Sequence, residues 1–226
     1  MIYESKSQEY FKHNRSEIAE ILFQNFLLGD NVTVLDIGCG NGNFFHTLKS
    51  KSNINYIGID QFQNYTSDYT HLALDVNTLE LKELEKIFTK YKPSIIILND
   101  VLEHLVNPEG LLENLSKLSF NFNFKISISV PNIRFFPILK HILLDGDFLY
   151  AESGVLDNTH LRFFTKKSIE RIFHKYNFCV LAHSLINIPK SKFLYFTSSI
   201  IKKTRFSDII SPQLYYLIQH DDKKNN

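Results

Sequence analysis

The sequence has few cysteines and no excess of charge of either sign. Its 226 residues include two cysteines and carry a formal net charge of +1, with an isoelectric point of about 7.8. Cys39 lies in a glycine-rich stretch and Cys179 in an apolar run, so we expect no disulfide framework and a reducing cytoplasm. The neutral balance argues against a nucleic-acid partner, because nucleic-acid-binding domains usually carry a clustered basic excess.

Long apolar runs and interdomain linkers are also absent. No run reaches the ~18 apolar residues of a membrane-spanning helix, and the first residues lack the apolar core of a signal peptide. No Pro/Gly/Ser-rich linker separates two hydrophobic blocks, although 44% of the residues are hydrophobic. We therefore expect a soluble chain whose residues 1–226 form one domain, with a cap inserted at 132–165 and a C-terminal extension at 187–226.

Short apolar runs alternate with amphipathic segments along the chain, which predicts an α/β fold. In such a fold a parallel sheet carries helices on both of its faces. Strands are expected at 32–37, 54–59, 72–75, 94–98, 125–130, 179–185 and 215–219. Helices are expected at 17–28, 43–50, 79–90, 108–119 and 166–176.

A glycine-rich loop follows the first expected strand. Residues 34–42 read VLDIGCGNG and place Gly38, Gly40 and Gly42 between a buried strand and a helix. Glycines at these positions allow a tight turn and let a ligand approach the main chain. The spacing is G-x-G-x-G, which disfavours an NAD-dependent oxidoreductase because a dinucleotide loop has the spacing G-x-G-x-x-G. Asp36, just before the glycines, would repel a phosphate and suits a cationic ligand.

Acidic residues end the next two expected strands. Asp60 follows YIGI, where a carboxylate can accept hydrogen bonds from both hydroxyls of a ribose. Asp75 would reach an adenine amino group, and Val76 would pack on the ring. A purely structural interpretation makes all of these turn residues at strand ends, but their order along the chain favours ligand binding.

Together with IIILNDVLEHLVNP at 95–108, these motifs resemble class I S-adenosylmethionine-dependent methyltransferases over about residues 10–185. The resemblance implies a Rossmann-like, doubly wound, seven-stranded sheet that is mostly parallel with an antiparallel last strand. It also implies S-adenosylmethionine as cofactor and S-adenosylhomocysteine as product. Residues 77–84 depart from the family's commoner acidic-aromatic patterns on the adenine side. The cofactor contacts expected from the motifs are Asp36, Gly38, Cys39, Gly40, Gly42, Asp60, Gln61, Asp75, Val76, Asn99 and Asp100.

Arg15 precedes the first expected helix and is a further cofactor candidate. Its guanidinium would match the methionine carboxylate in two parallel hydrogen bonds. The alternative is an arginine exposed to solvent on that helix.

Two stretches narrow the resemblance to one branch of the superfamily. DVLEHLVNP at 100–108 resembles the branch that contains ubiquinone-type O-methyltransferases and many bacterial surface-glycan methyltransferases, and LDNTHLRFFT at 156–165 resembles a signature of glycan-cluster methyltransferases. That branch implies methyl transfer to a hydroxyl of a sugar or nucleotide-linked sugar. His160 and His104 are then the candidate catalytic residues, because a positioned imidazole can remove a hydroxyl proton. Glu103, Asn132 and Arg162 are the candidate substrate contacts.

The same residues also have a structural interpretation, in which hydrogen bonds from 159–162 pin the cap to the sheet and His104 is a packed residue. The acceptor is equally open to a quinone-like phenol or another polar metabolite, and a silent S-adenosylmethionine-binding scaffold would retain the same loop. No metal site is expected, because Asp and His do not cluster at ligand spacing. The basic, aromatic segment 192–206 suits a peripheral membrane contact, the protein's own sheet or a dimer contact. A monomer or a homodimer is expected.

Overall fold

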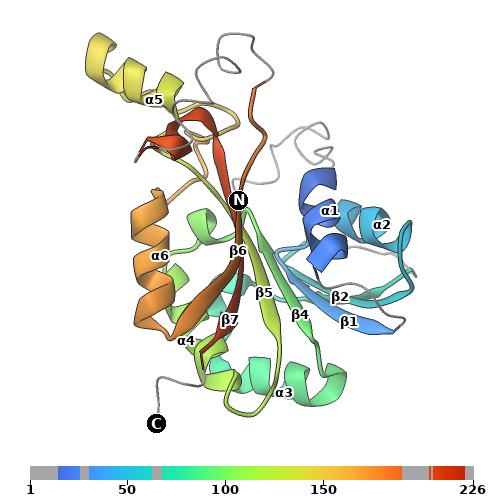
Figure 1. Cartoon of the computed structure of the whole chain (residues 1–226). Coiled ribbons are helices and arrows are strands. Elements are labelled where there is room, and N and C mark those ends of the chain that lie inside the picture. Colours follow the sequence, from blue (N-terminus) through green and yellow to red (C-terminus); the bar gives the residue numbers. More distant parts are fainter. Residues whose placement is uncertain (1–14, 26–30, 63–67, 190–203, 205, 222–226) are drawn as a thin grey trace.

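The structure is a computed structural model that describes residues 15–25, 31–62, 68–189, 204 and 206–221. Within these residues one sheet holds seven strands in the order β3-β2-β1-β4-β5-β7-β6 (Figure 1). The strands are β1 (Val32–Ile37), β2 (Ile54–Asp60), β3 (Thr70–Ala73), β4 (Ile95–Asn99), β5 (Lys125–Pro131), β6 (Phe178–Ile186) and β7 (Gln213–His220). Strands β1 to β5 pair in parallel, whereas β7 is antiparallel to both of its neighbours. The predicted sheet, mostly parallel with an antiparallel last strand, is therefore confirmed.

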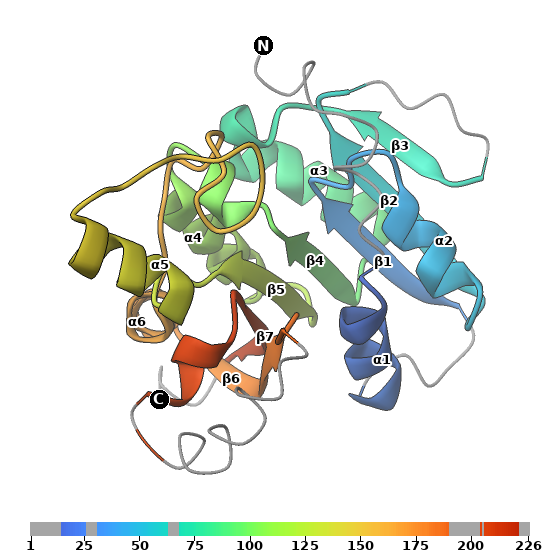
Figure 2. The same ribbon diagram turned by 90° about the horizontal axis from the view of Figure 1, so that it is seen from above.

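Helices cover both faces of this sheet. They are α1 (Ser16–Asn25), α2 (Asn43–Lys49), α3 (Leu81–Tyr91), α4 (Pro108–Leu118), α5 (Phe136–Lys140) and α6 (Lys166–Lys175), with short 3-10 turns η3 (Val76–Thr78), η4 (Leu102–His104) and η6 (Ser207–Ile210) and a π-helical turn η5 (His141–Asp145). Figure 2 shows α1 and α2 on one side of the sheet and α3, α4 and α6 on the other. None of the described helices is long and apolar enough to cross a membrane.

The alternation of side chains along the central strands builds two cores. Ile96 and Leu98 of β4 pack with α3, α4 and α6, whereas Ile95 and Ile97 pack with α1 and α2. Because both faces are covered, β4 is apolar along most of its length instead of alternating with polar residues.

The direction of β7 brings a late part of the chain to the functional edge of the sheet. Gln213, the first residue of β7, pairs with Pro131, the last residue of β5. The start of β7 therefore lies beside the carboxyl ends of the parallel strands, where ligands bind in open α/β sheets.

The region 132–165 leaves and rejoins the sheet at one point. Asn132 forms an isolated parallel bridge with Phe164, and the Ile133 amide donates to the Phe164 carbonyl. Between these points lie α5, η5 and an irregular loop, and α5 stands beyond the end of α6 in Figure 1. Most of segment 192–206, interpreted above as a surface contact, lies outside the described residues.

Candidate functional site

A cavity of about 350 Å³ opens at the carboxyl ends of the parallel strands. Its volume lies within the range of small-molecule sites, about 300–1,000 Å³. Residues from the loops after β1, β2, β4 and β5 line it, together with part of the region 132–165 and the start of β7. The described residues that form its walls include Arg15, Gly38, Cys39, Gly40, Asp60, Gln61, Asp75, Val76, Asp100, Glu103, His104, Asp157, His160, Asn187 and Gln213.

The glycine loop brings bare backbone to the cavity wall. Gly38 has a φ of 81°, and a Cβ atom there would lie 2.6 Å from a methyl carbon of Val101. Gly42 also has a positive φ, 80°. Only glycine adopts such angles at little cost. At Gly38 the missing side chain also makes room for Val101 in the loop after β4. The loop therefore fits a ligand that rests against the main chain.

Asp60 faces the cavity from the end of β2. Its carboxylate accepts hydrogen bonds from the Gly40 amide at 2.8 Å and from the Phe62 amide at 3.1 Å. A carboxylate has about four lone-pair positions, so two further donors can still bind. A fixed, ionisable acceptor beside a glycine loop suits the pair of hydroxyls on a ribose.

Asp36 lies beneath the loop and does not line the cavity. It is 1% exposed, and its carboxylate accepts a hydrogen bond from the Tyr56 hydroxyl. Burial raises its pKa from 3.8 to about 6, against the lowering effect of Tyr56 and Arg15. Burial likewise raises the pKa of the Cys39 thiol, which therefore stays protonated at neutral pH.

Arg15 and Asp100 form an ion pair in the cavity lining. Their side chains lie 3.1 Å apart, and Asp100 also accepts hydrogen bonds from Ser129 and Gln213. Asp100 adopts a φ of 57°, which aims its side chain away from the path of β4. Arg15 thus lines the cavity already paired with a carboxylate of the protein.

The residues after β3, expected from the sequence to face an adenine, form a short turn at the cavity. Asp75 caps the turn η3 by accepting from the Asn77 amide at 2.9 Å. The Asn77 side chain in turn accepts from the Val106 amide and ties this turn to the loop after β4. Asp75, Val76 and Gln61 line the cavity, whereas Asn99 is 1% exposed and lies outside the lining. Both polar atoms of the Asn99 amide lack a hydrogen-bond partner within the part of the chain that the structure describes.

Glu103, His104 and His160 meet in the cavity lining. One potential ligand atom from each lies within 4.8 Å of the others, and the two imidazole centroids are 4.8 Å apart. Glu103 is fully buried, and burial together with repulsion from Asp100 raises its pKa well above the ordinary value. Burial and then His160 lower the pKa of His104 to about 4, so this imidazole is neutral at physiological pH.

Backbone carbonyls orient both imidazoles. Nδ1 of His104 lies 3.2 Å from the Thr159 carbonyl oxygen, and Nδ1 of His160 lies 3.0 Å from the Val155 carbonyl oxygen. An Nδ1–H that donates to a carbonyl fixes the tautomer in which Nε2 carries the lone pair. The Glu103 carbonyl accepts from the amides of Leu161 and Arg162, which holds the segment carrying His160 against η4.

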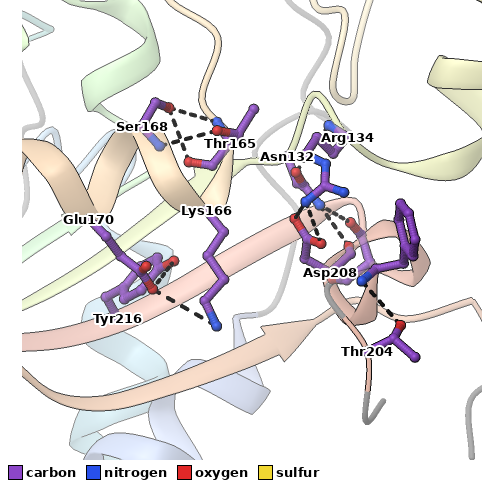
Figure 3. Close-up of polar contacts among 11 residues, drawn as sticks. Asn132, Arg134, Thr165, Lys166, Ser168, Glu170, Thr204, Asp208 and Tyr216 are labelled. Atoms are coloured by element: carbon purple, nitrogen blue, oxygen red, sulfur yellow. Dashed lines mark hydrogen bonds and ion pairs between the residues drawn. The ribbon is translucent and has the colours of Figure 1, made fainter. Parts of the chain in front are cut away.

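Two predicted substrate contacts lie outside the cavity lining. Asn132 is fully buried and donates to the carbonyls of Asp208 and Ser211 at 2.8 and 3.0 Å (Figure 3). The exposed Arg162 directs its guanidinium to the Val106 carbonyl. Both side chains have structural partners here, and we do not assign them to the acceptor.

Sequence reasoning missed Gln213 and Asn187, which line the cavity from the starts of β7 and of the segment after β6. Their side chains bond to each other, and Gln213 reaches Asp100 and Ser129. No motif marks them. The signal that was available is topological, because an antiparallel last strand begins at the ligand edge.

With this geometry in place, comparison with known proteins identifies the class. Residues 4–183 match the family model described as a methyltransferase domain. The chain belongs to this methyltransferase domain family.

Individual relatives are more distant. A tRNA (guanine-N(7)-)-methyltransferase of Mycoplasma capricolum subsp. capricolum is 28% identical over 160 residues, which cover 67% of this chain and 66% of that protein. A SAM-dependent methyltransferase from Archaeoglobus fulgidus has a TM-score of 0.60 at 19% identity, covering 95% of this chain and 97% of its own. The 1,6-didemethyltoxoflavin-N1-methyltransferase of Burkholderia thailandensis has a TM-score of 0.59 at 13% identity, with 95% and 82% covered. At these identities the structural matches show a shared fold.

Proposed function

We propose that this chain transfers the methyl group of S-adenosylmethionine to a hydroxyl of a small polar acceptor, a sugar or nucleotide-linked sugar. The observation that carries the proposal is one cavity whose lining includes the bare backbone of the glycine loop and Asp60 together with Glu103, His104 and His160. The domain would span residues 1–226, with 132–165 as its cap, and the free thiols Cys39 and Cys179 fit the cytoplasm.

The cofactor is S-adenosylmethionine, and this chain offers a matched contact for each of its parts. Gly38 and Gly40 would lie against the methionine portion, and Arg15 would face its carboxylate. Asp60 would accept from the ribose hydroxyls, and Val76 with Asp75 would hold the adenine. When bound, this cofactor supplies a methyl group on a sulfonium sulfur, and transfer to an acceptor oxygen leaves the thioether S-adenosylhomocysteine.

The polar residues Glu103, His104 and His160 would bind and orient the acceptor. Orienting the hydroxyl at the methyl group supplies much of the rate in a displacement whose leaving group is already good. His160 and His104 are the residues placed to contact that hydroxyl and to take up its proton, a contribution of about 10²-fold or more. Glu103 stands beside both imidazoles and would accept a hydrogen bond from the acceptor.

An aromatic cluster beside His160 supports a sugar as the acceptor. Phe148 and Phe163 lie 5.5 Å apart between ring centroids, Phe148 and Tyr150 also 5.5 Å, and Phe163 is 6.4 Å from His160. Phe148 is 41% and Tyr150 55% exposed. Exposed aromatic faces next to a polar pocket suit a ring that has apolar C–H faces and a hydroxylated edge.

The test is release of S-adenosylhomocysteine by purified protein across nucleotide sugars, phenols and transfer RNA. We expect turnover with a nucleotide sugar, a loss of at least tenfold in cofactor affinity for Asp60→Ala, and a loss of about 10²-fold in kcat for His160→Ala. Glu113→Ala, on the exposed face of α4, is the matched control and should change neither quantity.

Transfer RNA is tested as an acceptor because the Mycoplasma relative is a tRNA methyltransferase. Turnover confined to RNA or to phenols would refute the sugar proposal and leave methyl transfer in place. Cofactor binding without turnover on any acceptor would favour the scaffold instead.

A further inference from the structure

The fully buried carboxyl of Glu103 is the starting point. Both of its oxygens lack a hydrogen-bond partner among the described residues, although the side chain is 0% exposed. Buried polar groups in proteins are almost always satisfied by protein, by water or by an ion. Glu103 lines the cavity, so its partner is expected to come from within the cavity.

The neighbours of Glu103 are of the types that bind metals. His104 and His160 each place a ligand atom within 4.8 Å of the carboxylate and of each other. Their Nδ1 atoms lie against the carbonyl oxygens of Thr159 and Val155, so Nε2 carries the lone pair in both rings. Metal-binding histidines characteristically donate the other ring N–H to a carbonyl or carboxylate, which orients the ring.

A second layer of hydrogen bonds fixes one of these rings. The Thr159 hydroxyl lies 3.2 Å from Nδ1 of His104 and donates to Asp157 at 2.7 Å. The Thr159 amide also donates to the same Asp157 oxygen, at 2.8 Å. The chain from Asp157 through Thr159 to His104 has the form of the outer layer of a metal site.

We propose that Glu103, His104 and His160 bind a divalent first-row transition metal ion in the acceptor half of the cavity. Two imidazoles and one carboxylate are the ligands of catalytic zinc sites of the His₂Glu type, which leave a coordination position open. Imidazole nitrogens favour transition metals over Mg²⁺ or Ca²⁺. Ligands about 2.0–2.2 Å from one ion lie roughly 3–3.5 Å apart, so these ligand atoms would approach one another by at most roughly 1.3–1.8 Å on binding.

The metal ion would activate the acceptor hydroxyl, and this role rests on the proposed function. An acceptor hydroxyl bound at the open position is polarised, and its pKa falls. The proton passes to solvent, the oxygen forms the bond to the methyl carbon, and the bond between that carbon and sulfur breaks with its electron pair left on sulfur. His160 and His104 then act as ligands instead of as bases.

Co²⁺ is the probe, because its affinity for such sites exceeds that of Mn²⁺ and its visible absorption reports coordination. Calorimetric and optical titration of the full chain should show one saturable Co²⁺ per protein. Glu103→Gln, which keeps the shape of the side chain, and His160→Gln should each weaken binding at least tenfold. His141→Ala is the matched control, because His141 forms an exposed imidazole–carboxylate pair with Asp145 and should contribute nothing. Circular dichroism of each variant checks that it is folded.

Absence of a saturable Co²⁺ site overturns the proposal, as does binding that Glu103→Gln leaves unchanged or that His141→Ala abolishes. Release of S-adenosylhomocysteine with and without a chelator separates this proposal from the one above. Turnover that is insensitive to chelation, without Co²⁺ binding, would overturn the metal site and leave methyl transfer intact. One tight Co²⁺ that depends on Glu103, without turnover on any acceptor, would uphold the metal site alone.

Discussion

At the scale of single residues, Asp36 links the glycine loop to the pH dependence of stability. Its buried carboxylate has a pKa raised from 3.8 to about 6, with burial as the main cause. The native state therefore binds more protons than the unfolded state between about pH 4 and pH 6, and stability falls as pH rises through this window. The two pKa values differ by about two units, which corresponds to about 3 kcal/mol above pH 6.

Asp36→Asn should remove this contribution, because an amide oxygen can still accept from the Tyr56 hydroxyl and does not titrate. Urea unfolding from pH 4 to pH 7 should show the stability of the variant rising relative to wild type as the pH increases. Glu113→Gln, an exposed carboxyl, is the control and should track wild type. Parallel curves for wild type and Asp36→Asn would show that Asp36 is not the group responsible.

Gly38 makes a second prediction at this scale. A methyl group at Gly38 would lie 2.6 Å from a Val101 methyl carbon, and the φ of 81° disfavours any side chain. Gly146 has a similar φ, 67°, with nothing within 4 Å of its Cβ position. We expect Gly38→Ala to cost about 2–3 kcal/mol and Gly146→Ala about 1 kcal/mol in urea denaturation.

The difference between the two variants isolates the steric clash from the backbone strain. Adding Val101→Ala to Gly38→Ala should recover part of the loss. Equal costs at Gly38 and Gly146 would mean that Val101 moves aside freely.

Sequence motifs predicted the residues around the glycine loop better than those around His160. Gly38, Asp60 and Asp75 were predicted because local motifs place them at strand ends, and all three line the cavity. His160, His104 and Glu103 were all expected at the acceptor, but their close cluster was not predicted, because more than fifty residues separate His160 from the other two and the fold of the region 132–165 brings them together. Gln213 lies still further along the chain.

At the scale of elements, a capping box stabilises the start of α6. The Thr165 hydroxyl accepts from the Ser168 amide at 3.1 Å, and the Ser168 hydroxyl accepts from the Thr165 amide at 2.9 Å (Figure 3). Removing an N-cap hydroxyl typically costs about 1 kcal/mol. Thermal or urea unfolding should show that loss for Thr165→Ala, whereas Thr165→Ser should remain close to wild type. A loss as large in the serine variant would assign the effect to packing of the threonine methyl group.

The accuracy of the predicted strand and helix boundaries depended on the strength of the hydrophobic pattern. β1 and β4, which are buried on both faces, were predicted to within one residue. β3 was expected at 72–75 and lies at Thr70–Ala73, because this partly exposed edge strand has no apolar run to mark it. α5 and η5 were not predicted, because the region 132–165 was interpreted as an irregular cap although Ile138, Leu139 and Ile142 follow helical spacing, and none of the residues in α5 and η5 is buried.

At the scale of the whole molecule, a partly buried ion pair joins the start of the region 132–165 to the chain that enters β7. A guanidinium nitrogen of Arg134 lies 2.9 Å from both carboxylate oxygens of Asp208, whose side chain is 3% exposed (Figure 3). Asn132 reinforces the junction by donating to the Asp208 carbonyl. The pair thus connects segments more than seventy residues apart at the edge of the sheet that carries the cavity.

Arg134→Ala would leave the Asp208 carboxylate buried without its counter-charge, and we expect a loss of about 2–4 kcal/mol in urea denaturation. The double variant Arg134→Ala with Asp208→Asn should be more stable than Arg134→Ala alone, because it removes the unpaired charge. Lys117→Ala breaks an exposed pair with Glu113 on α4 and should cost no more than about 0.5 kcal/mol. If Arg134→Ala cost as little as Lys117→Ala, the junction would be held by Asn132 and by packing instead of by charge.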